Sequence, residues 1–137
     1  MSFLETLMAT PDRLSTASKY TVFNGWIYMG AGALLVAWPG ATQALFMERA
    51  FVGHEEGLIR ALGLTVVVIG WLYYFGGRTG APSVPAASIV DRLIFVPGVL
   101  LPLALSGVFP RLLVAFAILD PALAIGAWVL MRRDAKG

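Results

Sequence analysis

Long apolar runs dominate the pattern of hydrophobic and polar positions along this chain. Four of them approach the length of about 20 residues that a helix needs to cross the hydrocarbon core of a bilayer. They cover residues 20–38, 58–76, 86–108 and 112–131. Each run is about twice as long as a membrane barrel strand, and a helix satisfies its backbone hydrogen bonds within the segment. The pattern therefore predicts four transmembrane helices.

Proline and glycine mark the ends of these runs. Pro39-Gly40 ends the first, and a segment rich in both residues, 76–85, separates the second from the third. Phe109-Pro110-Arg111 alone joins the third to the fourth, which makes those two helices antiparallel neighbours. Pro97 and Pro102 predict a bend in the third helix. We expect an all-α, antiparallel, integral membrane four-helix bundle that forms a single domain over residues 1–137.

Two segments outside the runs have apolar patterns of their own. Ser2-Phe3-Leu4-Glu5 fits a capping box and predicts a short helix ending before Pro11, so that residues 1–18 form an interfacial segment. Glu5 and Asp12 argue against a secretory signal. The outer loop, residues 39–57, alternates apolar and charged residues. It predicts an amphipathic helix or re-entrant segment over one end of the bundle, or a helix at headgroup level.

The composition agrees with a membrane protein. Hydrophobic residues make up 58% and charged residues 13% of the 137 positions, with a mean hydropathy of +0.79. Soluble domains contain about 45–50% apolar and about 25% charged residues. These values exclude an ordinary soluble domain, a disordered chain and a nucleic-acid-binding protein.

Metal and cofactor chemistry has few residues to use here. The chain has no cysteine and a single histidine, His54, which excludes thiolate sites and histidine clusters. Glu55 and Glu56 follow His54, but adjacent residues on a helix do not converge on one ion. We expect this triplet to precede the second transmembrane helix, where acidic groups suit the helix dipole. We expect no metal and no cofactor.

The positive charges predict the orientation in the membrane. The formal net charge is only +2, which suits an anionic lipid surface better than a polyanion. Of the 10 lysines and arginines, three (Arg49, Arg60 and Arg111) fall on one side of the predicted spans. The others fall on the opposite side: Arg13, Lys19, Arg78, Arg92, Arg132, Arg133 and Lys136. Both termini are therefore expected in the cytoplasm, with the protein in a bacterial inner membrane.

Asp120 is the most informative polar residue. It lies about nine residues into the fourth run, roughly 13 Å along a helix, where an unpaired carboxylate costs at least about 2.5–3.5 kcal/mol. Pro121 follows it and frees a backbone carbonyl in the preceding turn. Two interpretations stay open: a ligand-binding or proton-handling carboxylate inside the bundle, or a structural acid held by one arginine.

Arg60 is the expected partner of Asp120. Small and apolar residues, Gly63 and Val67, continue its helix face, so we expect its side chain to point into the bundle. The two residues differ in depth by about 9 Å along the bundle axis. A leaning arginine and one bridging water would span that distance.

Tyr28, Asn24 and Asp91 complete the candidate site. Asn24 and Tyr28 are one helical turn apart and share a face of the first helix. We expect Asp91 to face inward and Arg92 to snorkel to the cytoplasmic surface. The alternative for Asp91 is an interfacial salt bridge with Arg78 or with the arginines near the C-terminus. The candidate ligand-binding residues are thus Asp120, Arg60, Tyr28, Asn24 and Asp91.

Six further aromatic residues of the spans are expected to anchor the helices at the two membrane interfaces. They are Trp26, Trp38, Trp71, Tyr73, Tyr74 and Trp128. The alternative is an aromatic pocket that they line together with Asn24 and Tyr28.

The chain resembles the DoxX-like group of small bacterial four-helix membrane proteins. The similar features are the amphipathic outer loop, the run Glu56-Gly57-Leu58-Ile59-Arg60-Ala61-Leu62-Gly63 and the tight turn before the fourth helix. The likeness covers most of the chain and is one of hydropathy. It implies an inner-membrane protein, and some members associate with quinone-linked oxidoreductases. A more distant likeness, to proteins of the sterol-isomerase and sigma-receptor type, implies intramembrane acids around a lipophilic cavity.

From these features we expect a non-enzymatic accessory or binding protein. It would hold a lipophilic molecule such as a quinone, or a larger membrane partner, among membrane lipids and as a homo-oligomer or part of a complex. Two alternatives remain. One is a cofactor-free enzyme acting on a lipid, an isomerase for example, with Asp120 as its acid–base group. The other is a subunit of a small transporter or channel, which would have to oligomerise to form a pore.

Overall fold

The computed structural model describes residues 1–137 and contains helices as its only regular elements. Three long helices are α2 (Thr16–Ala37), α4 (Glu55–Arg78) and α7 (Pro110–Lys136). The remaining span, Ser83–Leu105, is the third in chain order and is divided into α5 (Ser83–Val90), a π-helical turn η1 (Asp91–Phe95) and α6 (Val96–Leu105). All four are long and apolar enough to cross a membrane. The predicted all-α membrane bundle is confirmed.

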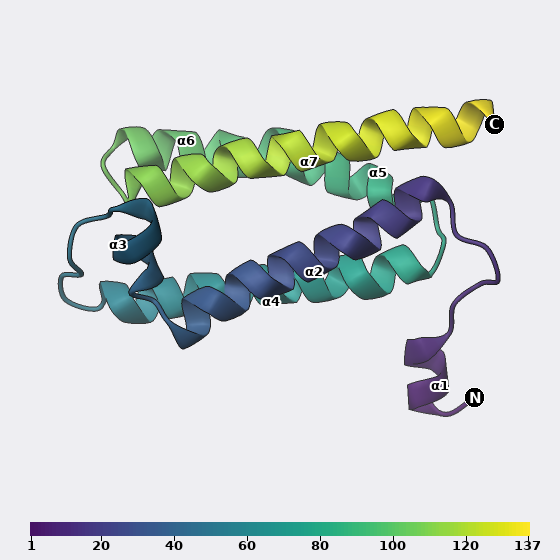
Figure 1. Ribbon diagram of the computed structural model, residues 1–137, viewed down its shortest axis with the longest axis horizontal. Helices are drawn as coiled ribbons and strands as arrows, with labels where there is room; N and C mark the ends of the chain where they lie inside the picture. Colours follow the sequence, from purple (N-terminus) through teal and green to yellow (C-terminus); the bar gives the residue numbers. More distant parts are fainter.

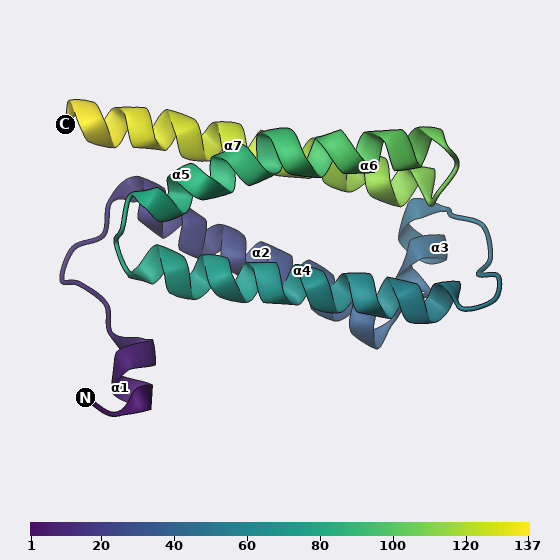
Figure 2. The ribbon, with the colours of Figure 1, turned by 180° about the vertical axis from the view of Figure 1, so that it is seen from behind.

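The bundle consists of two helical hairpins. α2 lies against α4, and α6 lies against α7, as both views of the ribbon show (Figures 1 and 2). α2 also contacts α7, which holds the hairpins together. Both chain termini lie at the same end of the molecule (Figure 1). The short helix α3 and its loop cover the other end.

A seam of glycines brings the α2 and α4 backbones into contact. Gly25 and Gly32 of α2 face Gly70 and Gly63 of α4. The two glycines of each helix are seven positions apart. A Cβ atom added at Gly70 would lie 2.5 Å from the backbone nitrogen of Met29 and 2.6 Å from the oxygen of Gly25. One added at Gly63 would lie 2.8 Å from the oxygen of Gly32. Small residues permit this close approach where lipid supplies no hydrophobic driving force.

The third span bends at the π-helical turn. The backbone N–H of Val96 donates to the carbonyl of Asp91, five residues earlier. The next residue, Pro97, has no N–H with which to continue the α-helical ladder. α5 and α6 consequently run at an angle to each other (Figure 2). The expected bend is present, but it precedes Pro97 and places Asp91 and Arg92 within the turn.

Apolar residues close the end of the bundle that lies opposite the termini. The buried cluster there is formed by Leu35, Ile59, Ala104, Phe109, Leu112 and Leu113. Phe46 and Phe51 of the outer loop pack against it. Only α3 (Ala41–Phe46) is helical in this loop, because Met47 adopts a left-handed backbone conformation with φ of 54°. The expected amphipathic or re-entrant helix is thus limited to six residues.

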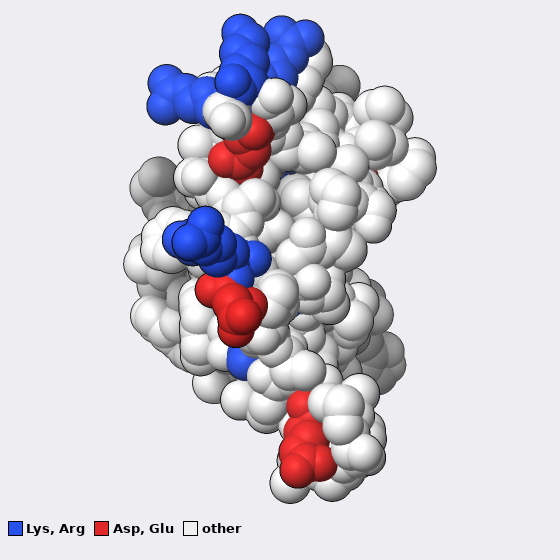
Figure 3. Space-filling view, turned by 90° about the vertical axis from the view of Figure 1, so that its right-hand side faces the viewer, with Lys and Arg blue, Asp and Glu red and all other residues white.

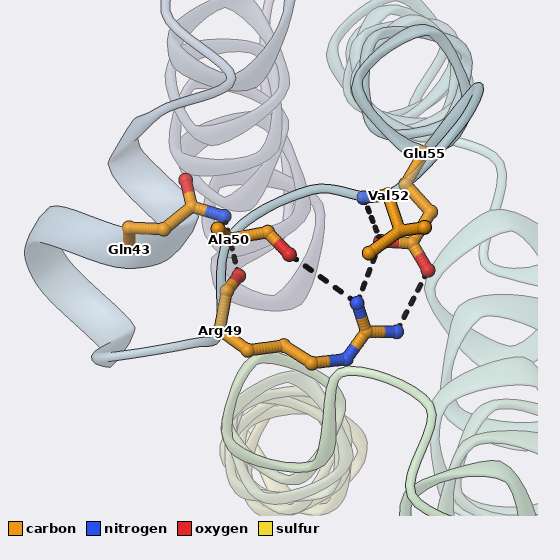
Figure 4. Close-up of polar contacts among 5 residues, drawn as sticks. All are labelled: Gln43, Arg49, Ala50, Val52 and Glu55. Atoms are coloured by element: carbon orange, nitrogen blue, oxygen red, sulfur yellow. Dashed lines mark hydrogen bonds and ion pairs between the residues drawn. The ribbon is translucent and has the colours of Figure 1, made fainter.

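Polar contacts hold the rest of the outer loop in place. Arg49 pairs with Glu55 at the start of α4, with an Nη2–Oε1 distance of 2.7 Å (Figure 4). The Gln43 side chain donates to the Arg49 carbonyl at 2.9 Å. One Glu48 oxygen accepts from the backbone N–H groups of Arg111 and Leu112, at 2.7 and 3.0 Å. Glu48 thereby caps the start of α7, where the first N–H groups lack partners within the helix.

The connection before α7 differs from the expected three-residue turn. α6 ends at Leu105, and residues 106–109 form the turn. Gly107 has φ of 91° there and Phe109 has φ of 37°. Pro110 is the first residue of α7, a position that suits proline because its missing N–H would have no partner there.

The N-terminal helix α1 (Phe3–Met8) has the predicted capping box. Ser2 Oγ accepts from the Glu5 backbone at 3.2 Å, and the Ser2 backbone donates to Glu5 Oε2 at 2.5 Å. α1 lies apart from the four spans (Figure 1), and none of its residues is buried. Arg78 ties it to α4 by donating to the Met8 carbonyl at 2.9 Å. Phe3 is 79% exposed, which suits a helix lying at the lipid surface.

Acidification is expected to fray α1. The hydrogen bond that the Ser2 backbone donates to the Glu5 carboxylate is the main cause that lowers the pKa of Glu5 below its ordinary value. The capping contribution is therefore present above the pKa of the unfolded segment and is lost as the pH falls through the folded-state pKa. Hydrogen exchange of the Glu5 and Thr6 amides should accelerate, relative to the intrinsic rate, as pH falls through that range. Glu5→Gln keeps the capping geometry without the titration, so equal acceleration in this variant would contradict the assignment.

Candidate functional site

A cavity of about 270 Å³ lies between α4 and α6. Most of its wall is aliphatic or aromatic, with Phe95 and Phe116 among the lining residues. The polar lining residues come from α2, α4, η1 and α7: Tyr28, Thr65, Tyr73, Asp91 and Asp120. This volume is slightly below the range of about 300–1,000 Å³ for ligand pockets, and it would suit a small organic molecule or the end of a lipid.

The cavity opens sideways to the surroundings of the bundle. Phe95 and Val99 of the third span line it, yet they are 63% and 59% exposed. Thr65 of α4 also lines it and is exposed. These residues lie well within the candidate membrane spans, so in a membrane the opening would face the hydrocarbon. A molecule dissolved in the bilayer would then reach the cavity without passing through water.

Tyr28 and Asp120 form one polar contact of the cavity. The phenolic O–H of Tyr28 on α2 donates to Oδ1 of Asp120 on α7 at 2.6 Å. Both residues are buried. Asp120 is the eleventh residue of α7, so it lies about 15 Å from the start of the helix. The bond joins the two hairpins at this depth.

Tyr73 and Asp91 form a second contact of the same kind. The Tyr73 O–H donates to Oδ2 of Asp91 at 2.9 Å and so joins α4 to the π-helical turn. The rings of Tyr28 and Tyr73 meet edge to face, with centroids 5.5 Å apart. The two phenol–carboxylate pairs therefore form one cluster, which we name the polar cluster: Tyr28, Tyr73, Asp91 and Asp120.

Arg92 lies beside the polar cluster and is 1% exposed. Its side chain folds back along its own helix, where Nε donates to the Ser88 carbonyl at 3.1 Å and Nη2 to Ser88 Oγ at 3.0 Å. The guanidinium stacks over the Tyr73 ring, 5.2 Å from its centroid. The expected snorkelling of Arg92 is wrong. A cation in this position offsets one of the two negative charges that Asp91 and Asp120 bring into the membrane interior.

Arg60 does not meet Asp120, and the expected pairing is wrong. Nη1 of Arg60 donates to the Val36 carbonyl at 2.5 Å, and Nη2 donates to Glu56 at 3.2 Å. Its side chain is about half exposed at the outer end of α4. The reason is the glycine seam: Gly63 faces α2, so the same face of α4 directs Arg60 toward the last turn of α2. The carbonyls of a last turn have no partner within the helix.

The alternative salt bridge of Asp91 is also absent. Arg78 instead donates to Thr10 Oγ1 at 3.0 Å and to the Tyr74 hydroxyl at 3.1 Å. Asp91 faces inward as expected and lines the cavity.

Asn24 lies next to the site without lining the cavity. It is fully buried on α2, one turn before Tyr28, and its amide nitrogen and oxygen have no hydrogen-bond partner. Of the five candidate residues, the structure therefore brings Tyr28, Asp91 and Asp120 together. Asn24 lies one helical turn from Tyr28. Arg60 lies near the start of α4 and contacts the end of α2 instead.

Sequence analysis missed Tyr73 and Arg92. Tyr73 was grouped with the aromatic anchors, although it follows Val66 at heptad spacing and both residues line the cavity. Trp26, Trp38, Trp71 and Trp128 are all about half exposed. Trp26 is the eleventh of the 22 residues of α2, so it lies at the middle of the helix and not at its end. Arg92 had no such pattern, because its inward position depends on the π-helical turn.

The chemistry available in the cavity is that of carboxylates and phenols. No group of three or more His, Cys, Asp or Glu residues is placed to hold a metal ion. Each carboxylate accepts one phenolic hydrogen bond on one oxygen, and its second oxygen makes no hydrogen bond. The cavity thus combines an apolar wall with oxygen atoms that can bind a polar group.

Comparisons of the chain with models of protein families, with curated proteins and with solved structures give no match. The features on which a function can be argued are therefore the four candidate spans, the lateral cavity and the polar cluster.

Proposed function

We propose that this chain is an integral membrane binding protein that holds a lipophilic molecule in the cavity between α4 and α6. One observation carries the proposal: the cavity is apolar along most of its wall, open to the side of the bundle, and polar where Tyr28, Tyr73, Asp91 and Asp120 meet. The apolar cluster beneath the outer loop closes the outer end. A ligand would therefore enter from the bilayer.

The polar cluster would provide most of the affinity. Moving an alkyl chain from lipid into an apolar cavity exchanges one apolar environment for another, so little hydrophobic free energy is gained. A hydrogen bond formed in a low dielectric is stronger than one formed in water. A head group that reaches Asp91 or Asp120 would therefore select the ligand from the bulk lipid.

The charge distribution supports a cytoplasmic location of both termini in a bacterial inner membrane. Basic side chains gather at the end of the molecule that carries the termini (Figure 3). The exposed ones there are Arg13, Lys19, Arg132, Arg133 and Lys136. Positive charge in short segments next to the spans favours the cytoplasmic side. The DoxX-like resemblance supports the same location and suggests a larger membrane complex as the setting.

Filling the cavity is expected to remove the bound molecule. Val66 lines the cavity and is buried, so tryptophan at this position would occupy its volume. Val68, two residues along the same helix, is 48% exposed and does not line the cavity. Native mass spectrometry of protein released from its membrane should show a non-protein adduct in the parent and in Val68→Trp. The adduct should be lost in Val66→Trp.

The same measurement can contradict the proposal. An adduct of equal mass and occupancy in both tryptophan variants would place the bound molecule outside the cavity. A parent protein without any adduct, both from its own membrane and after addition of lipid extract, would leave the cavity without a ligand and overturn the proposal.

A second function, lipid isomerisation, is favoured by one specific observation. Asp91 and Asp120 line the same cavity, so one acid could deliver a proton to a substrate while the other removes one. Incubation of the protein with an unsaturated lipid extract in deuterated water would test this. Incorporation of deuterium at carbon that depends on Asp120 would favour the enzyme, and its absence would favour the binding protein.

A further inference from the structure

We infer that the head group of the ligand donates hydrogen bonds to the polar cluster. The site would then select a lipophilic alcohol or ammonium over a lipophile whose head only accepts, such as a ketone, an ester or an oxidised quinone. This inference rests on the proposed function, since it names the class of molecule that the same cavity takes.

The hydroxyl donors of the cavity are already used. A phenol has a single hydroxyl proton, and those of Tyr28 and Tyr73 are directed at Asp120 and Asp91. Thr65, the remaining hydroxyl in the lining, donates to the Ala61 carbonyl of its own helix at 3.0 Å. None of the three hydroxyls is left to donate to a ligand.

The guanidinium nearby does not supply the missing donor. Arg92 is not part of the cavity lining, and its Nε and Nη2 are used on Ser88. Its Nη1 is sealed within the protein and has no partner. A ketone or quinone oxygen in the cavity would consequently meet carboxylate oxygens and no donor. Burying such a polar atom without a hydrogen bond is unfavourable.

Acceptors, in contrast, remain free. Oδ2 of Asp120 and Oδ1 of Asp91 make no hydrogen bond. Neither oxygen is sealed inside the protein, unlike the amide atoms of Asn24. Both residues line the cavity, so a donor on the ligand can reach them. The cavity therefore offers only acceptors.

The formal charges favour a donor as well. Asp91 and Asp120 contribute two negative charges and Arg92 one positive charge, which leaves the buried group at −1. Uncompensated charge is costly at this depth in a membrane. A ligand ammonium would cancel it, and an alcohol would stabilise it through a hydrogen bond to an ionised oxygen.

Four probes with similar alkyl chains test the inference. They are dodecylamine, dodecanol, methyl decyl ketone and dodecane, each titrated into the purified protein in detergent and followed by native mass spectrometry. We expect the amine and the alcohol to occupy the cavity at least about tenfold better than the ketone or the alkane, the ratio for one hydrogen bond to a charged acceptor. Val66→Trp gives the background level.

A substitution at Asp120 should change the preference for donors. In Asp120→Asn, Oδ1 can still accept from Tyr28, while the amide NH₂ turns the free acceptor into a donor. We expect binding of the ketone to rise and that of the amine to fall. Asp91→Asn should act in the same direction and provides a second variant if Asp120→Asn does not fold. Val68→Trp, at a residue that does not line the cavity, should keep the parental order.

The outcomes separate this inference from the proposed function. Equal binding of amine, alcohol and ketone above the Val66→Trp background would overturn the donor requirement and leave the binding function standing. Stronger binding of the ketone than of the amine and the alcohol to the parent would also overturn the donor requirement. It would indicate that Asp120 is protonated and donates a hydrogen bond to the ketone. Binding of none of the four probes above background would overturn both.

Discussion

Replacing Gly70 by valine is expected to cost about 3 kcal/mol or more of stability, the upper end of the range for overpacked cores. A Cβ at this position would lie within 2.6 Å of backbone atoms of Met29 and Gly25. Backbone atoms within a helix cannot move aside as the tip of a flexible side chain can. The α2 and α4 helices would have to separate, and the contact that organises the first hairpin would be lost.

Gly30→Val is the matched control on the partner helix. An added Cβ at Gly30 meets no atom within 4 Å, because this residue faces away from the seam. Its stability should change by no more than about 1 kcal/mol, the scale of helix propensity. Unfolding by sodium dodecyl sulfate in mixed micelles, followed by circular dichroism, gives the free energy of unfolding of both variants. Equal stability of Gly70→Val and Gly30→Val would show that the helices do not approach each other as described.

Removing the buried charge of Arg92 should have a comparable effect. In Arg92→Met, the polar cluster loses the cation that lies beside it. The free energy of unfolding should fall by about 3–5 kcal/mol, the range for a buried charge left without its partner. Arg60→Met is the matched control, because Arg60 is half exposed and bonds only the end of α2 and Glu56. The control should lose no more than about 1 kcal/mol.

A double variant identifies the cause of the loss. Adding Asp120→Asn to Arg92→Met removes one uncompensated negative charge, so the double variant should be more stable than Arg92→Met alone. The same detergent titration measures this series. If Arg92→Met were as stable as Arg60→Met, or if Asp120→Asn weakened it further, charge compensation at the polar cluster would be contradicted.

The membrane bundle could be predicted from sequence because its main requirement is local. A span needs a certain length of apolar residues whatever its neighbours are, and proline and glycine mark its ends. The capping box of Ser2 and Glu5 is equally local and is present as predicted. The position of Asp120 in the interior of the bundle followed from the cost of leaving a carboxylate in lipid.

The partners of these acids could not be predicted in the same way. The pairing of Arg60 with Asp120 was argued from depth along the axis, but contact also depends on the direction each helix face takes. That direction is set by the glycine seam, whose heptad spacing at Gly63 and Gly70 is visible in the sequence while its register with α2 is not. Arg92 was placed wrongly because the π-helical turn changes the face on which it lies.

The cavity itself is a product of tertiary structure. It exists because α4 pairs with α2 and α6 pairs with α7, which leaves the wall between α4 and α6 open. The bend at η1 brings Asp91 to this wall opposite Tyr73. No pattern of spacing in a single helix contains this information.

An experimental structure of the protein in nanodiscs made from its own membrane lipids tests the binding function most directly. It should show elongated non-protein density that enters between α4 and α6 past Phe95 and Val99 and ends against Asp91 and Asp120. A bundle in which the side chains of α4 and α6 meet and fill this space, with Tyr28 and Asp120 sealed behind them, would contradict the proposed function.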